Sequence, residues 1–168
     1  SLDDGLKMVC ARGRLMDSLP QAGEMAVIFA DEASVNEVIA PYSAEVSIAA
    51  FNGPTNIVIS GVTEALKPIL ATFAERNVKT RALAVTQAAH SHFLDAILDE
   101  FESVAATVRY SAPRLSYVSC LTGKLVEGDE VTNANYWRGH LPFPLRFAEG
   151  MRTLYSEGYG HFLGIGPH

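Results

Sequence analysis

One stretch of the sequence, residues 24–85, carries a pattern of apolar runs and turns that few folds accommodate. Short apolar runs predict strands at residues 25–30, 46–51, 56–60 and 80–85. Asp31 is suited to cap a helix with one apolar face, and residues 65–76 predict a second helix. Asn52-Gly53-Pro54-Thr55 has the composition of a turn. The order β-α-β-β-α-β predicts a ferredoxin-like unit, in which two helices cover one face of an antiparallel sheet.

The flanking segments alternate helix and strand, which is typical of a layered α/β fold. Ser1 can cap a first helix whose apolar side chains include Leu2, Leu6 and Val9. Periodicity predicts helices at residues 2–18, 93–106, 134–139 and 145–156, and strands at residues 114–119 and 162–165. The sequence therefore predicts an α/β protein with an inserted α+β unit.

Charge and composition exclude several classes of function. The formal net charge is -6, and no run of Lys or Arg occurs, so a nucleic-acid binder is not expected. No apolar stretch is long enough to cross a bilayer and no signal peptide opens the chain, so we expect a soluble cytoplasmic protein. Cys10 and Cys120 lie far apart in apolar surroundings, and we interpret them as buried thiols of a reducing compartment.

His90 is the residue best placed for chemistry. It lies in a predicted loop, residues 86–91, that leaves a strand and enters a helix, where α/β proteins often place reacting groups. A histidine there can act as a general base near neutral pH, or it can be a surface or capping residue. A metal site built from His90 and His92 is less favoured, because no third ligand stands at a telling spacing.

Two further groups are candidates for a binding site. Arg12 and Arg14 are separated by about 200° around a helix, so one can face a cleft and clamp a carboxylate while the other stays in water. Two solvated arginines are the alternative.

His140 follows an aromatic pair and can either orient another group or simply be exposed. No dinucleotide-binding motif and no Gly-x-Ser-x-Gly elbow occur in the chain. The residues alone therefore predict an α/β protein in which a histidine can act as a base, and they do not indicate a reaction.

Several strings, read in order along the whole chain, resemble the acyltransferase domains of modular type I polyketide synthases and the related malonyl-CoA:acyl carrier protein transacylases. SLDDGLKMVCARGRLM is similar to a helix that follows the nucleophile elbow, and VSIAAFNGPTNIVISG resembles the hairpin of the small subdomain. QAAHS stands at the histidine motif. SCLTGKL, YWRGHLPFPLRF and FLGIGPH resemble S-N-x-T-G, Y-W-x-x-H-x-x-x-P-V-R-F and the closing strand.

The resemblance implies a division of the chain. Residues 1–22 and 87–168 are expected to belong to a hydrolase-like large α/β subdomain, and residues 23–86 to the inserted ferredoxin-like small subdomain. The implied function is transfer of a malonyl-type unit from acyl-CoA to the phosphopantetheine thiol of an acyl carrier protein, through a seryl acyl-enzyme. No resident cofactor or metal is implied. The expected partners are acyl-CoA, the carrier protein and other synthase domains.

The resemblance also assigns residues. His90 matches the base, and Arg12 matches the arginine that pairs with the free carboxylate of the malonyl group. His140 matches a position that orients the histidine through its carbonyl or side chain, and Asn52 lies in a turn near the pocket. Gln87 and Ala89 belong to the specificity motif, which reads H-A-F-H in malonyl-selective members and Y-A-S-H in methylmalonyl-selective ones. Ala89 stands where a malonyl-selective member has a Phe that narrows the pocket, so the freed volume can admit an α-substituent. Alternatively, Gln87 can narrow the pocket again. We favour malonyl as the commoner substrate.

One departure from the family pattern decides what we expect of the chain alone. The serine elbow G-H-S-x-G is absent. We therefore expect a C-terminal fragment that begins downstream of the serine and cannot form the acyl-enzyme by itself. Its uncovered apolar surface is expected to favour oligomers. The alternative is a non-catalytic carrier-protein docking module or structural remnant that contains the ferredoxin-like unit.

Overall fold

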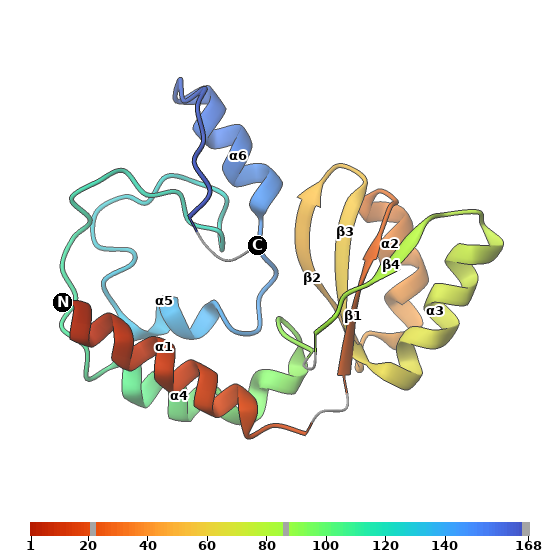
Figure 1. Ribbon diagram of the computed structural model, residues 1–168, viewed down its shortest axis with the longest axis horizontal. Helices are drawn as coiled ribbons and strands as arrows, with labels where there is room; N and C mark the ends of the chain where they lie inside the picture. Colours follow the sequence, from red (N-terminus) through yellow and green to blue (C-terminus); the bar gives the residue numbers. More distant parts are fainter. Residues whose placement is uncertain (21–22, 86–87, 166–168) are drawn as a thin grey trace.

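A computed structural model of the chain describes residues 1–20, 23–85 and 88–165 (Figure 1). The elements are α1 (Leu2–Asp17), β1 (Gly23–Ile28), α2 (Glu32–Ile39), the 3-10 turn η1 (Ala40–Tyr42), β2 (Val46–Gly53), β3 (Asn56–Val62), α3 (Thr63–Glu75), β4 (Thr80–Ala82), the 3-10 helix η2 (His92–Ile97), α4 (Leu98–Ala105), α5 (Ala134–Gly139) and α6 (Phe147–Ser156). Among the described residues, no helix combines the length and hydropathy needed to cross a membrane.

The four strands form one antiparallel sheet in the order β2-β3-β1-β4. Helices α2 and α3 lie together beside this sheet (Figure 1). Asp31 caps α2, accepting a hydrogen bond at Oδ1 from the Ser34 backbone N–H at 2.9 Å. The element order and the antiparallel pairing predicted for residues 24–85 are therefore confirmed, whereas the assignment of subdomain boundaries stays a prediction.

The sheet is buried on both of its faces. Ala26 and Ile28 of β1 point toward α2 and α3 in the main core. Met25 and Val27, whose side chains alternate with these along the strand, belong to a second apolar cluster that also contains Ala89 and Leu145. The residues of this second cluster come from β1, β2 and β3, from Leu83 just after β4, and from the C-terminal half of the chain. Burial on both faces explains why β1 reads as a continuous apolar run.

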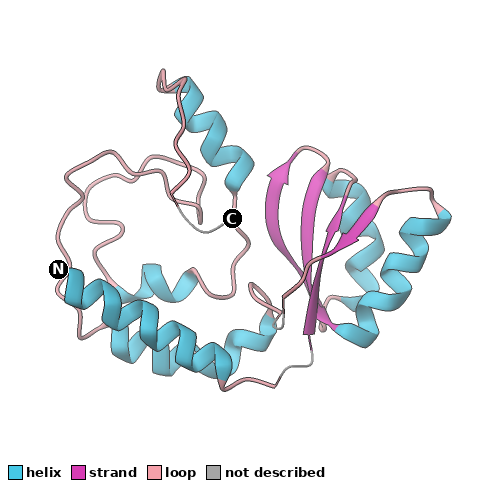
Figure 2. Cartoon of the chain, viewed as in Figure 1, coloured by secondary structure: helices cyan, strands magenta, loops and turns pink. Residues whose placement is uncertain are grey.

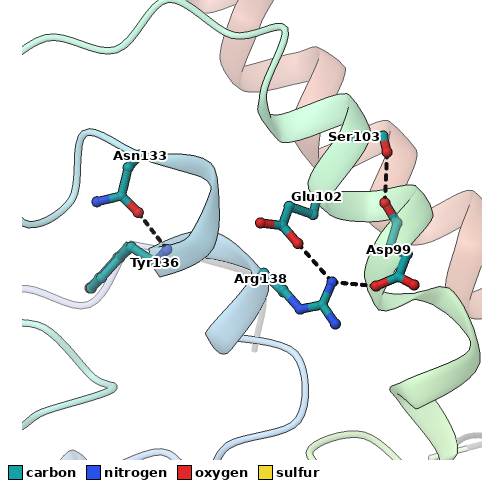
Figure 3. A network of polar contacts seen from close by, with 6 residues as sticks. All are labelled: Asp99, Glu102, Ser103, Asn133, Tyr136 and Arg138. Atoms are coloured by element: carbon teal, nitrogen blue, oxygen red, sulfur yellow. Dashed lines mark hydrogen bonds and ion pairs between the residues drawn. The ribbon is translucent and has the colours of Figure 1, made fainter.

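The other part of the molecule is built mainly from helices and loops (Figure 2). Leu15 of α1 packs with Leu94, Leu98 and Phe101, so that α1 lies along α4. α5 is tied to α4 by Arg138, whose guanidinium donates to the carboxylates of Asp99 and Glu102 (Figure 3). These contacts hold the C-terminal end of α5, where His140 lies, against the helical layer.

Two strands predicted for this part are not formed by the described residues. Residues 114–119 form no strand, because only Val118 makes a single bridge, to Leu125. Residues 162–165 form none either, and the side chains of Leu163 and Ile165 are 85% and 92% exposed. A strand requires a run of paired backbone groups, and the short pairing of residues 117–119 with residues 124–126 does not extend into one. The α/β alternation predicted for the second half is thus not formed.

The buried face of α1 and the state of the cysteines also differ from expectation. The apolar residues Leu2, Leu6 and Val9 are exposed, and the face of α1 that packs against α4 carries Ala11 and Leu15 instead. Cys10 and Cys120 are both exposed free thiols, because Cys10 lies on the outer side of α1 and Cys120 lies in a surface turn. Whether the exposed apolar side chains drive oligomerisation stays a prediction.

Candidate functional site

A pocket of about 570 Å³ brings together three segments that are far apart in the sequence. Arg12 of α1, His90 of the loop before η2 and His140 at the end of α5 all line it. Its walls also include apolar side chains such as Leu141 and Leu145. The pocket therefore combines a cation, two imidazoles and an apolar lining, which is the composition of a small-molecule site.

Arg12 and Arg14 lie on different sides of α1. Arg14 donates to the Glu100 carboxylate of α4 at 3.0 Å. The side chain of Arg12 makes no hydrogen bond or ion pair with the other described residues, although it lines the pocket. A guanidinium that faces a pocket without a carboxylate partner of its own can bind the carboxylate of a ligand through two parallel N–H donors.

His90 is held in an uncommon backbone conformation. Its φ is 57°, in the left-handed region that few residues other than glycine adopt, and its side chain is only 8% exposed. The loop is closed by Ser91, whose hydroxyl donates to the Ala88 carbonyl at 2.6 Å and accepts from the Phe93 backbone N–H as the cap of η2. Such conformations persist where the surrounding structure over-determines them, as is common at functional sites.

The imidazole of His90 is oriented by a backbone carbonyl. Nδ1 lies 3.0 Å from the carbonyl oxygen of Phe143. Because a carbonyl oxygen only accepts, this bond requires the proton on Nδ1 and leaves the lone pair of the neutral ring on Nε2. Sequence reasoning missed Phe143, since its contribution is a main-chain atom. The sequence feature that distinguishes Phe143 is its place between Pro142 and Pro144, which restrict the backbone on both sides.

His140 lies in the same pocket but does not make the bond that we expected of it. The orienting bond to His90 comes from Phe143, three residues further on. The ring of His140 stacks on Trp137 with centroids 5.6 Å apart and meets the edge of Tyr136 at 4.9 Å. Its Nε2 is buried and has no hydrogen-bond partner among the residues that the structure describes. The structure thus places His140 beside the candidate base, and its catalytic role stays a prediction.

Both imidazoles are held as weaker bases than usual. Burial lowers the pKa of His90 below its ordinary value of 6.5, and the nearby Arg12 cation lowers it further, while the Phe143 hydrogen bond acts in the opposite direction. Burial, Arg12 and His90 together lower the pKa of His140. Both rings are therefore neutral at neutral pH, the state in which Nε2 of His90 can accept a proton.

Two of the remaining candidates, Ala89 and Asn52, do not line this pocket. Gln87 lies outside the described residues. Ala89 packs against the second face of the sheet, and Asn52 is exposed on β2 near the hairpin. Neither residue lines the pocket, and their predicted roles in substrate binding are untested. His92 lies at the surface beside Asp95, and no group of three or more potential metal ligands occurs among the described residues.

The sequence profile of the acyl transferase domain family matches residues 1–168. Among curated proteins, the spectinabilin polyketide synthase system protein NorB of Streptomyces orinoci is 38% identical over 167 residues, which is 99% of this chain and 8% of that protein. Mycoketide-CoA synthase of Mycobacterium tuberculosis is 39% identical over 99% of this chain and 4% of its own length. The chain thus spans less than a tenth of these relatives.

Solved structures share the fold. The acyltransferase domain from the second module of the salinomycin polyketide synthase superposes with a TM-score of 0.89 at 40% identity, covering 94% of this chain and 37% of that one. The malonyl-CoA:acyl carrier protein transacylase of Xanthomonas oryzae pv. oryzae superposes with a TM-score of 0.84 at 30% identity, covering 94% and 52%. With a family profile that matches from the first residue to the last, this chain belongs to the acyltransferase domain family of type I polyketide synthases and malonyl-CoA:acyl carrier protein transacylases.

Proposed function

We propose that this chain supplies the base and the carboxylate-binding arginine of an acyltransferase that moves a malonyl-type unit from CoA to the phosphopantetheine thiol of an acyl carrier protein. One observation carries the proposal, which is that Arg12 and His90 line the same pocket. Family membership supports the reaction class. The pairing of a cation with a neutral imidazole supports a substrate that has a carboxylate at one end and a reactive carbonyl at the other.

In the proposed reaction, His90 acts on a serine that another segment of the domain provides. Nε2 accepts the serine proton as the serine oxygen attacks the thioester carbonyl. The tetrahedral intermediate collapses, the C–S bond breaks, and the imidazolium returns the proton to the departing CoA thiolate. The carrier-protein thiol then repeats the sequence in reverse on the acyl-enzyme. The Phe143 carbonyl keeps Nδ1 protonated, so that Nε2 is the nitrogen that exchanges the proton throughout.

Arg12 would bind the free carboxylate of the malonyl unit. A bidentate guanidinium–carboxylate contact fixes the orientation of the acyl chain and discriminates against acyl groups that lack the charge. The pocket between Arg12 and His90 would then hold the short chain that separates the carboxylate from the thioester. We favour malonyl over larger extender units for this site, in line with the name of the transacylase relative.

The base is tested by replacing it in the complete domain. His90→Ala should abolish the acyl-enzyme, which mass spectrometry detects as an increase in protein mass after mixing with malonyl-CoA. His92→Ala is the matched control, because His92 is exposed at the surface and should load normally. This chain by itself, which has no Gly-x-Ser-x-Gly, should stay unmodified. Full loading of His90→Ala would remove His90 from the mechanism.

A further inference from the structure

Leu145 joins the edge of the small sheet to the segment that orients His90. Its backbone N–H donates to the Ala49 carbonyl at 2.9 Å, and its carbonyl accepts from the Phe51 N–H at 2.8 Å. Leu145 also forms a parallel bridge with Ala50. This short stretch therefore pairs with β2 on the side opposite to β3, as an added edge strand would.

The side chain of Leu145 makes a second connection to the same sheet. It packs in the apolar cluster that contains Met25 and Val27 of β1. Ala89, the residue before His90, packs in this cluster as well. The loop carrying His90 is also held close to β1 at Gly23, where an added Cβ would collide with Ala88. The sheet thus supports both the loop of His90 and the segment that contains its carbonyl partner.

The link from Leu145 to the Phe143 carbonyl is short and stiff. Only Pro144 separates the two residues. A proline restricts the preceding residue to extended conformations, so Pro144 limits the orientations open to the Phe143 carbonyl. On the other side, the Phe143 N–H donates to the Gly139 carbonyl at 3.3 Å. With both ends fixed, the carbonyl has little freedom to leave His90 Nδ1.

We infer that Leu145 is a positioning residue, which uses its bonds to the β2 edge and its packing on the sheet to hold the Phe143 carbonyl against His90 and so set the tautomer of the imidazole. The use of His90 as a base rests on the proposed function. The tautomer is a property of the chain itself, and it can be measured without any acyl transfer.

The effect of Leu145 on the His90 tautomer can be distinguished from an effect of the charged groups around His90. Arg12 faces it from α1, and His140 faces it from the end of α5. Neither residue lies on the sheet. A change at Leu145 therefore alters the hydrogen-bond acceptor at Nδ1 without removing a charge from the pocket.

The test is an NMR measurement on the whole chain, in which imidazole ¹⁵N shifts at mildly alkaline pH report the tautomer of His90. The wild-type protein should show mainly Nδ1–H. Leu145→Ala should raise the ratio of Nε2–H to Nδ1–H about 2- to 10-fold, which is the range that one net hydrogen bond supports. Leu145→Met, which keeps the volume, should restore the wild-type ratio.

Leu83→Ala is the matched control. Leu83 is a half-buried leucine that packs against the same cluster, and it forms no hydrogen bond with Phe143 in the part of the chain that the structure describes. This variant should lose stability but keep the wild-type tautomer. An unchanged tautomer in a folded Leu145→Ala, or an equal change in Leu83→Ala, would overturn the inference.

A measurement on the wild-type chain covers the case in which Leu145→Ala does not fold. As urea is raised below the unfolding transition, the His90 tautomer should change together with the loss of hydrogen-exchange protection at the Leu145 and Phe51 amides. A tautomer that persists after both amides have lost protection would contradict the role of Leu145. Neither experiment depends on loading of the serine, so failure of the proposed function would leave these results unaffected.

Discussion

At the scale of single residues, the site depends on a buried His90 imidazole that stays uncharged. The ring is buried, an arginine lies nearby, and a carbonyl is the hydrogen-bond acceptor at Nδ1. Burial and the Arg12 cation both disfavour the imidazolium, and the same two causes act on His140. A pair of depressed histidine pKa values has a consequence for the stability of the whole chain.

We predict that the free energy of unfolding decreases as the pH falls below 6.5, the ordinary histidine value. Between that value and the lower folded-state pKa, the unfolded chain binds more protons than the native one, so acid favours unfolding. The contribution is fully present above the unfolded pKa and is lost as the pH falls through this window. Urea denaturation followed between about pH 8 and 5 measures it, at pH values above the ordinary pKa values of Asp and Glu, about 3.9 and 4.3.

The variant His90→Gln is the control for this pH dependence. Glutamine does not titrate, so the variant should show a smaller decrease in stability over the same range. An equally steep decrease in His90→Gln would mean that other groups cause it. A flat profile in the wild-type chain would contradict the depressed pKa values of both histidines.

The residues of the site were accessible to sequence reasoning to different degrees. His90 and Arg12 could be singled out because a loop histidine and a helix arginine have recognisable side-chain chemistry. Phe143 could not, because any residue carries a carbonyl and only its flanking prolines distinguish it. That Ala89 would pack on a sheet face, away from the pocket, depends on tertiary contacts that no local pattern contains.

At the scale of elements, the order of β1, α2, β2, β3, α3 and β4 was predictable because the periodicity, the caps and the turn chemistry all agreed. The strands predicted at 114–119 and 162–165 failed because each rested only on a short apolar run. Such a run does not determine whether a partner strand is present. The face of α1 was also misjudged, since apolar residues occur on both of its sides and the packing of α4 decides which one is buried.

Phe73 of α3 provides a test of the main core. Its side chain is fully buried among residues of the sheet and α2. Phe73→Ala should lower the free energy of unfolding by about 3–5 kcal/mol, because it removes apolar burial and leaves a cavity. Leu70→Ala, on the same helix but half-buried, should cost clearly less. Urea denaturation measures both, and equal losses would indicate that the core collapses around the cavity.

At the scale of the whole molecule, the pocket exists only when distant parts of the chain are in place. Arg12, His90 and His140 come from the beginning, the middle and the last third of the sequence. The helical layer of α1, α4 and α5 fixes the first and the last of these residues. A ligand that contacts more than one of them should therefore stabilise the folded chain as a whole.

We predict that malonate raises the thermal midpoint of unfolding more than acetate does at equal ionic strength. Arg12 can bind one carboxylate while the second lies toward His90, and only the native state offers both contacts. Binding at 100 times the dissociation constant would add about 2.7 kcal/mol to stability. Differential scanning fluorimetry over a series of malonate concentrations measures the shift.

The two arginines of α1 make a matched pair for this experiment. Arg12→Ala should remove the difference between malonate and acetate. Arg14→Ala should keep it, because Arg14 pairs with Glu100 on the other side of the helix. If malonate raised the thermal midpoint above that with acetate by the same amount in both variants, its carboxylate would bind at a site other than Arg12.

The burial of the small sheet on two faces has a consequence for hybrid synthases in which part of an acyltransferase domain is exchanged. Residues on one face of β1, such as Ala26 and Ile28, pack in the core cluster formed by the sheet, α2 and α3. A foreign unit would bring its own matching set of these residues. Met25 and Val27 on the other face contact Ala89 and Leu145, which a graft of residues 23–85 would leave behind in the recipient. A hybrid synthase made by exchanging this unit should therefore work best when the graft also includes the loop of His90 and the stretch up to Leu145, so that both halves of that contact come from one parent.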